Sequence, residues 1–225
     1  MTMPASDAPL KLPTFCDCES FRYQTLPVFL RACKHTGPLN FELSTIDQRL
    51  QPLGQSTPST ISTLLVKNSY LYSIKYDGIR VQLLTGGRVY TKSGHQIPFV
   101  HHGLDVPDGH ILDAEMVAQP YLVGRTRKTY ANGMARLKDH LGTGYEYRLI
   151  DVVTLPDQPF QNRYLWLQQR FPDQTVAQSP LKNTSHMQQQ LTEASDQGHE
   201  GIVVRDASAL FYTLRRARNM FKLKS

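Results

Sequence analysis

One short stretch of the chain combines a possible nucleophile with a carboxylate, a glycine and a guanidinium: Lys75-Tyr76-Asp77-Gly78-Ile79-Arg80. A lysine attacks only as the free amine, and because its unperturbed pKa is about 10.4, few lysines are neutral at pH 7. Burial and neighbouring cations lower that pKa, and Arg80 or a bound metal ion could be such a cation. Gly78 would let the backbone approach a phosphate closely. The alternative is a surface turn that matches the pattern by chance.

Two further pairs of charged residues are two positions apart, the spacing that puts side chains on one face of a β-strand. Asp113 and Glu115 lie in an apolar stretch, residues 110–118, that we expect to be a strand. Lys222 and Lys224 lie in a second such stretch, residues 220–224. Because two amines on one face are unfavourable unless they meet water or an anion, the second pair indicates an exposed face or an anion-binding site.

The surrounding pattern predicts the elements that would position these side chains. Strands are expected at residues 70–74, 79–84, 88–92, 110–118, 145–153, 201–205 and 220–224, with a hairpin at Gly86-Gly87. Helices are expected at residues 160–171 and 184–197, the second ending at Gly198. In the first helix Tyr164, Leu167 and Phe171 share one apolar face. The mixture predicts an α+β fold of antiparallel β-sheets flanked by helices.

Residues 1–60 are interpreted as an N-terminal extension, partly helical and with a linker. A short helix is expected to begin after Thr25 and to stop at Gly37-Pro38. Residues 51–63 are rich in Ser, Thr, Pro and Gly, which indicates a loop or linker. Four residues could be zinc ligands, although their spacing is tighter than usual and the third fits a core position better: Cys16, Cys18, Cys33 and His35.

Composition bounds the class of protein. The 225 residues carry a net charge of +6 with three cysteines, and the sequence pI is near 9.2. The charge fits a polyanionic partner, and the few cysteines favour a reducing compartment. No apolar run of about 18 residues predicts a membrane span, and residues 1–10 do not resemble a secretory signal. We therefore expect a cytoplasmic protein, or a nuclear one in a eukaryote, that is not secreted and not bound to a membrane.

Basic residues gather in two segments. Residues 212–225 contain five cations and no acid. Residues 121–139 contain a second group of basic side chains. A solvated face or a flexible loop explains the second group as well as a contact with a phosphate backbone does.

Six stretches of the sequence follow one another in an order and at a spacing that resemble those of the superfamily of ATP-dependent DNA ligases, RNA ligases and mRNA capping enzymes. They are Lys75-Tyr76-Asp77-Gly78-Ile79-Arg80, Lys92-Ser93-Gly94, Leu112-Asp113-Ala114-Glu115, Arg148-Leu149-Ile150-Asp151, Glu200-Gly201-Ile202-Val203-Val204-Arg205 and Lys222-Leu223-Lys224. The DNA ligase versions are the most similar. The resemblance implies an ATP-grasp-like nucleotidyltransferase (adenylation) domain over residues 61–225, with the usual OB-fold domain absent.

By this resemblance Lys75 would attack the α-phosphate of ATP and become lysyl-AMP. AMP would pass to a 5′-phosphate, and a 3′-hydroxyl would displace it to seal a nick in duplex DNA, as in DNA repair and DNA replication. The implied nucleotide-binding residues are Lys75, Arg80, Glu115, Ile150, Glu200, Lys222 and Lys224. Glu115 and Glu200 would also hold Mg²⁺. The implied nucleic-acid contacts are Arg80, Lys92, Arg205, Arg216 and Arg218.

Some positions depart from the family pattern. Lys92 stands where arginine is commoner, Ile150 where many ligases stack an aromatic on adenine, and Ser73 where many have a glutamate facing the adenine amino group. The sequence also stops one residue after Lys224, from which we expect a slow first step and possible completion by a separate OB-fold chain or another protein. An RNA ligase, a capping enzyme, a non-catalytic nucleic-acid-binding module and an interaction scaffold are the alternatives.

Overall fold

A computed structural model of the chain describes residues 46, 50, 54–55, 65, 69–92, 94–118, 145–210 and 219–224. All of them belong to one compact unit, Leu43–Ser225. The predicted helix after Thr25, the four possible zinc ligands and the basic segment 121–139 lie outside the described residues, so they stay predictions.

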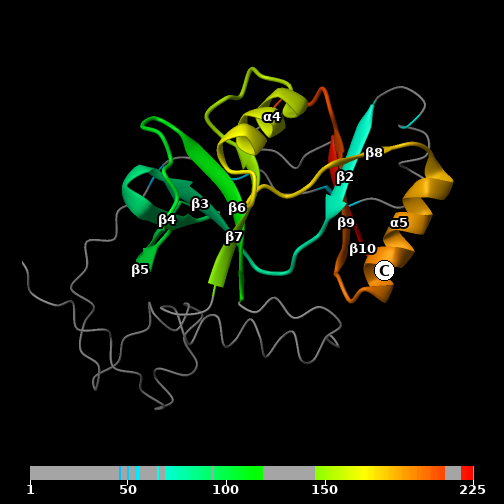
Figure 1. Cartoon of the computed structure of the whole chain (residues 1–225), viewed down its shortest axis with the longest axis horizontal. Helices are drawn as coiled ribbons and strands as arrows, with labels where there is room; N and C mark the ends of the chain where they lie inside the picture. Colours follow the sequence, from blue (N-terminus) through cyan, green and yellow to red (C-terminus); the bar gives the residue numbers. More distant parts are fainter. Residues whose placement is uncertain are drawn as a thin grey trace, which may run out of the picture. The chain divides into compact units, whose positions relative to one another are not determined.

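The first of two five-stranded sheets, sheet I, has the strand order β5-β4-β3-β6-β7 and is antiparallel throughout (Figure 1). Its strands are β3 (Ile79–Leu84), β4 (Arg88–Thr91), β5 (Gln96–His101), β6 (Ile111–Ala118) and β7 (Tyr145–Val152). The turn η2 (Thr85–Gly87) joins β3 to β4, with Gly86 at φ 71° and Gly87 at φ 75°. Both φ values lie in the left-handed region that favours glycine, and the predicted hairpin is confirmed.

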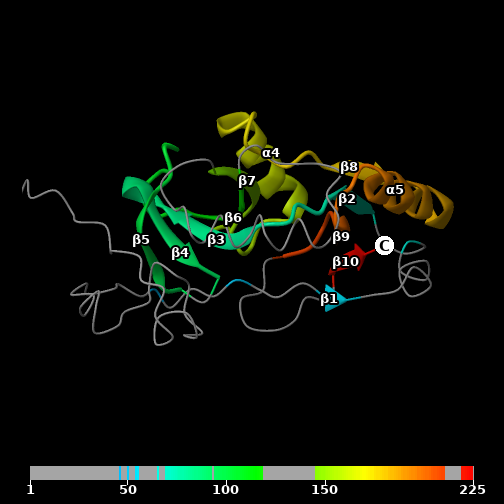
Figure 2. The same ribbon diagram turned by 90° about the horizontal axis from the view of Figure 1, so that it is seen from below.

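Sheet II has the strand order β1-β10-β9-β2-β8. Its strands are β1 (Gly54–Gln55), β2 (Tyr70–Ile74), β8 (Ser179–Leu181), β9 (Gly201–Asp206) and β10 (Met220–Lys224). Figure 2 shows β1 beside β10, to which it is parallel, whereas the other neighbours are antiparallel. Strands from distant parts of the sequence therefore meet here, so that β2, which precedes Lys75, lies next to β9.

Each described helix packs on a different sheet. The helix α4 (Phe160–Arg170) packs against β7 of sheet I (Figure 1). The helix α5 (Thr184–Asp196) buries Met187, Leu191 and Ala194 against sheet II. Asn183 caps α5, since its side chain accepts a hydrogen bond of 2.9 Å from the backbone N–H of His186, which satisfies one of the unpaired donors of the first turn.

Sheet II has one apolar face and one polar face. The face under α5 carries Tyr70, Ile202, Val204, Phe221 and Leu223, all buried. Because side chains alternate along a strand, the intervening residues of β2, β9 and β10 point to the opposite face. Direct cross-strand pairing places them in rows, with Ser73 beside Val203 and Lys222, and Gly201 beside Lys224. The predicted common side of the two terminal lysines is confirmed.

The predicted fold of antiparallel sheets flanked by helices is confirmed, but three strands were missed. β1 has two residues, β8 contains Pro180, and β5 contains Pro98, and proline lowers the strand signal because it removes a backbone donor. The buried face of α4 also differs in part. Leu167 and Phe171 are buried as predicted, whereas Tyr164 is only half-buried and Arg163 takes a core position.

Candidate functional site

Lys75 follows directly after β2 and is tied to β9. Its backbone N–H donates a hydrogen bond of 2.9 Å to the carbonyl of Gly201. Its side chain is 16% exposed, and its ammonium group bonds Oε2 of Glu200. A lysine with a largely buried stem and an anchored backbone presents its amine in a fixed place, which a nucleophile requires.

Glu200 joins two amines at the end of sheet II. Its Oε1 accepts a hydrogen bond from Nζ of Lys224, and its Oε2 accepts the bond from Lys75. Burial raises the pKa of Glu200, but the hydrogen bonds from Lys224 and Lys75 outweigh burial and lower the pKa overall. The carboxylate is therefore ionised at neutral pH and holds two cations that would otherwise repel each other.

Gly201 allows the close pairing of β9 and β10 beside the contact of Lys224 with Glu200. Its φ is +139°, and a Cβ atom there would lie 2.0 Å from the carbonyl oxygen of Leu223 on β10. Any side chain would force β9 and β10 apart. The glycine thus lets the strand pair close at the point where Lys224 reaches Glu200.

The facing part of the site comes from sheet I. Arg80 on β3 forms a bidentate ion pair with Asp113 on β6, with Nε–Oδ1 at 2.9 Å and Nη2–Oδ2 at 2.6 Å. Burial lowers the pKa of Arg80, but the attraction and hydrogen bonding of Asp113 raise it overall. Glu115 lies directly across from Arg80 in the sheet. Burial raises the pKa of Glu115 to about 7, although Lys75 and Arg80 oppose that change.

Gly78 has a packing role that the sequence did not predict. A Cβ atom at this position would lie 2.3 Å from the carbonyl oxygen of Met116 and 2.9 Å from Cγ of Glu115. The glycine therefore lets the segment after Lys75 pass directly over β6. This contact with β6 requires a glycine at position 78, and the predicted approach to a phosphate stays a prediction.

Lys75, Arg80 and Glu115 line a common cleft to which both sheets contribute. Its lining residues are Ser73, Ile74, Lys75, Tyr76, Arg80, Glu115, Ile150, Val176, Val203 and Arg205. Its lining combines isoleucine and valine side chains and the buried Ser73 with charged groups. A cleft with apolar walls and a few convergent charges fits a ligand that has both a flat ring and an anionic group.

A family model for the ATP-dependent DNA ligase domain matches residues 51–224 of the sequence. The chain belongs to this family. It is the catalytic domain of an ATP-dependent DNA ligase, a nucleotidyltransferase, as the sequence predicted. Nick sealing in nucleic acid is the general activity of the family, and ATP is its nucleotide. None of the curated proteins matches the chain.

Solved structures share the fold of this ligase domain. A Lig E DNA ligase, described as binding DNA with a minimal scaffold, superposes with a TM-score of 0.57 at 19% identity over 80% of this chain and 70% of that one. Chlorella virus DNA ligase-adenylate gives 0.56 at 15% identity over 80% and 67%. The ATP complex of the bacteriophage T7 ATP-dependent DNA ligase gives 0.53 at 16% identity over 79% and 68%.

Several residues predicted from sequence come together in the ligase domain. Lys75, Arg80, Glu115 and Ile150 line the cleft, and Glu200 and Lys224 bond at its edge. Lys222 is half-buried on the polar face of sheet II, in the same row as Val203. Lys92 is exposed just after β4 and is not among the residues that line the cleft. Arg216 and Arg218 lie outside the described residues.

Arg205, for which a contact with nucleic acid was predicted, is buried in the structure. It is 4% exposed, its Nη1 donates a hydrogen bond of 2.8 Å to Oδ2 of Asp151, and its guanidinium lies 4.1 Å from the ring centroid of Phe160. Burial lowers the pKa of Arg205 to about 10, against the attraction of Asp151. In this structure the guanidinium is bonded to a protein carboxylate, and the nucleic-acid contact stays a prediction.

The two partners in the network of Arg205 were not predicted from the sequence. Asp151 ends one of the six ligase-like stretches, but no role was predicted for it. Arg163 lies in a predicted helix whose buried face was expected to carry Tyr164, Leu167 and Phe171 instead. A charged residue three positions after Phe160 and four before Leu167 lies on the buried face of α4, and that pattern was the available signal for a buried ion pair.

The described residues include neither a clustered metal site nor a membrane-spanning helix. They contain no group of three or more His, Cys, Asp or Glu side chains placed to hold a metal ion. A cation bound through one or two carboxylates and the phosphates of a substrate needs no such group. No helix among the described residues is both long enough and apolar enough to span a membrane.

Proposed function

We propose that this domain forms a lysyl-AMP at Lys75 from ATP, transfers AMP to the 5′-phosphate of a nick in duplex DNA, and promotes sealing by the 3′-hydroxyl, in DNA repair or replication. One observation carries the proposal. A single carboxylate, Glu200, bonds the amines of Lys75 and Lys224 beside a cleft that Arg80 and Glu115 also line. Such a set concentrates positive charge around one anchored amine.

The first step exchanges one bond for another at phosphorus. Nζ of Lys75 bonds the α-phosphorus while the bond from that phosphorus to the bridging oxygen breaks, and pyrophosphate leaves with the electron pair. Before attack the amine gives up a proton, for which the hydrogen bond to Glu200 offers a path. Lys222 and Lys224 would stabilise the negative charge on the α-phosphate, since transfer of this kind depends on positioning and charge stabilisation.

The lining of the cleft suits both the base and the phosphates of a nucleotide. We place the base among Ile150, Val176 and Val203, with Ser73 as its polar contact, because flat rings favour apolar walls. The phosphates then lie toward Lys75. Glu115 and Glu200 would hold Mg²⁺, which favours carboxylate oxygens and would offset negative charge on the phosphates.

Contacts with DNA are expected from cations outside the buried network. We propose that Lys92, Arg216 and Arg218 bind phosphates of the duplex. Such contacts weaken as salt rises because bound counterions are released. Arg80 is oriented by Asp113 toward the cleft edge and is proposed to act at the nucleotide and at the DNA end.

The decisive experiment is the mass of the intact protein after incubation with ATP and Mg²⁺. We expect a gain of one AMP in the wild type and in Lys182→Ala, which removes an exposed lysine after β8, but no gain in Lys75→Ala. Sealing of a nicked DNA duplex is then compared with sealing of a nicked RNA. Uptake of AMP by Lys75→Ala would contradict the role of Lys75, and preferential sealing of RNA would contradict the DNA assignment.

A further inference from the structure

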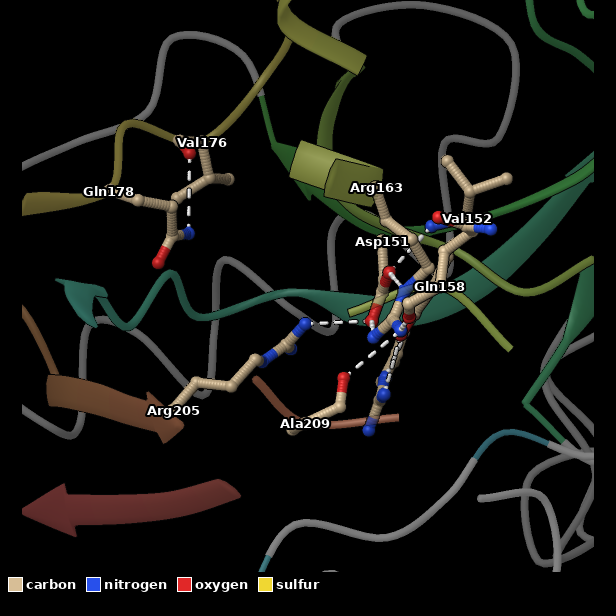
Figure 3. A network of polar contacts seen from close by, with 10 residues as sticks. Asp151, Val152, Gln158, Arg163, Val176, Gln178, Arg205 and Ala209 are labelled. Atoms are coloured by element: carbon tan, nitrogen blue, oxygen red, sulfur yellow. Dashed lines mark hydrogen bonds and ion pairs between the residues drawn. The ribbon is translucent and has the colours of Figure 1, made fainter. Parts of the chain in front are cut away.

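A buried carboxylate beneath the cleft is shared by two arginines. Asp151, at the end of β7, accepts hydrogen bonds from Nε of Arg163 at 2.6 Å and from Nη2 of Arg163 at 3.0 Å. It also accepts the bond from Arg205 at 2.8 Å. Figure 3 shows the three side chains converging from α4, β7 and β9. None of the three side chains is more than 5% exposed.

The two arginines join Asp151 to different parts of the fold. Arg163 comes from α4, which packs on β7, and it also donates to the carbonyls of Gln158 and Ala209. Arg205 comes from β9 of sheet II and lines the cleft, whereas Arg163 is not among the lining residues. The pair of Arg205 with Asp151 therefore connects sheet II to sheet I at a residue that lines the cleft proposed for the nucleotide.

The strand that carries Arg205 also sets the position of the nucleophile. β9 begins at Gly201, whose carbonyl accepts the backbone bond of Lys75. Glu200, which bonds the Lys75 ammonium, comes directly before it. Glu115 and Arg80 stand on sheet I, as does Asp151. The distance from Lys75 to the groups of sheet I thus depends on how β9 is held against β7.

A buried ion pair is a poor way to gain stability alone. Removing two charges from water costs several kcal/mol per ion, and apolar replacements are often as stable. Here the guanidinium of Arg205 also packs on Phe160, which is fully buried. A planar group fixed by a carboxylate on one side and an aromatic ring on another has little freedom. This arrangement specifies one geometry between the two sheets.

We propose that Arg205 is a positioning residue for nucleotidyl transfer, acting through Asp151 to hold β9, and with it Lys75 and Glu200, at a fixed distance from Glu115 and Arg80. The inference rests on the proposed function of Lys75. It does not require Arg205 to touch ATP or DNA. Loss of the pair should slow the chemical step more than it weakens the binding of ATP.

The test compares two variants that each remove one arginine from the same carboxylate, Arg205→Met and Arg163→Met. Single-turnover formation of lysyl-AMP is measured over a range of ATP concentrations, at a temperature where circular dichroism shows both variants folded. We expect Arg205→Met to lower the maximal rate by tenfold or more, since small misplacements of reacting groups cost up to about 10²-fold. We expect the apparent ATP affinity to stay within about threefold of wild type, because the residues proposed to contact ATP are unchanged.

Arg163→Met is expected to lose stability yet to keep its maximal rate within about threefold of wild type, because Arg163 does not line the cleft and the pair of Arg205 with Asp151 is kept. Arg205→Lys, which keeps a charge for Asp151, should recover part of the rate. Equal losses of rate in the two methionine variants, or no loss in Arg205→Met, would overturn the inference.

Failure of the proposed function would look different. A wild type that takes up no AMP would refute the role of Lys75, and hydrogen exchange would then decide the inference alone. The amides of β2 and β9 should exchange faster in Arg205→Met than in Arg163→Met, because loosening of a packed element exposes its backbone bonds. Equal exchange in the two variants would contradict the positioning role.

Discussion

Replacing Glu115 by glutamine is expected to stabilise the ligase domain, by an amount that grows as pH rises from the ordinary carboxyl pKa of 4.5 and is largest above about 7. The carboxyl group is half-buried, and burial raises its pKa from an ordinary 4.5 to about 7. In the unfolded chain the same group ionises near its ordinary value. Between the two pKa values the folded protein keeps a proton that the unfolded chain has released, so wild-type stability falls as pH rises through this range.

The size of the effect follows from the difference between the two pKa values. At about 1.4 kcal/mol for each pH unit, the change from 4.5 to about 7 corresponds to at most about 3 kcal/mol. Glutamine resembles the protonated acid in shape and carries no charge to bury. The variant should therefore match the wild type near pH 4 and exceed its free energy of unfolding by up to about 3 kcal/mol at pH 8.

Urea unfolding followed by circular dichroism between pH 4 and pH 8.5 measures this difference. Glu193→Gln, which removes an exposed carboxylate on α5, controls for the loss of one acid. If Glu115→Gln were less stable than the wild type at pH 8, the reasoning would be refuted. That result would mean that attraction to Lys75 and Arg80, which opposes burial at this carboxyl group, is the stronger effect.

Two further substitutions test the base site and the crossing over β6. Ser73→Glu should raise the preference for ATP over GTP in competitive labelling of Lys75 by about tenfold. A hydroxyl both donates and accepts hydrogen bonds, whereas a carboxylate only accepts them and repels the guanine carbonyl. An unchanged ratio would place the base elsewhere. Gly78→Ala should lower the free energy of unfolding by about 1–3 kcal/mol in urea, because its Cβ atom would lie 2.3 Å from the carbonyl oxygen of Met116. Gly103→Ala, where a Cβ atom meets no atom within 4 Å, is the control, and equal losses would contradict the packing argument.

The sequence was informative wherever function needs a fixed residue type at a fixed spacing. Strand periodicity placed Lys222 and Lys224 on one face, and the order of the stretches led to the ligase family, which the family model confirms. Gly86 and Gly87 predicted their hairpin because only glycine adopts positive φ freely. These inferences depend on local rules, which a sequence carries in full.

The missed features depend on contacts between distant segments. β8 is a strand only because Leu181 and its neighbours pair with β2. Arg163 is tolerated inside the fold only because Asp151, twelve residues earlier, neutralises it. The close contact of Gly78 with β6 was not predicted, because nothing in the sequence shows that β6 passes beside this glycine. Burial of Arg205 was equally invisible, since a charged residue in a strand usually faces solvent.

The distribution of charge explains why one group of cations is buried and another is left near solvent. Arg205 and Arg80 line the cleft but are paired with Asp151 and Asp113, and Arg163 shares Asp151, so these cations are fixed by protein carboxylates. At the cleft edge, the ammonium groups of Lys75 and Lys224 share the carboxylate of Glu200, and Lys222 stands on the same face. Lysines therefore gather where an anionic ligand can enter. A triphosphate would add negative charge beside these lysines, whereas the arginines are already neutralised by protein carboxylates.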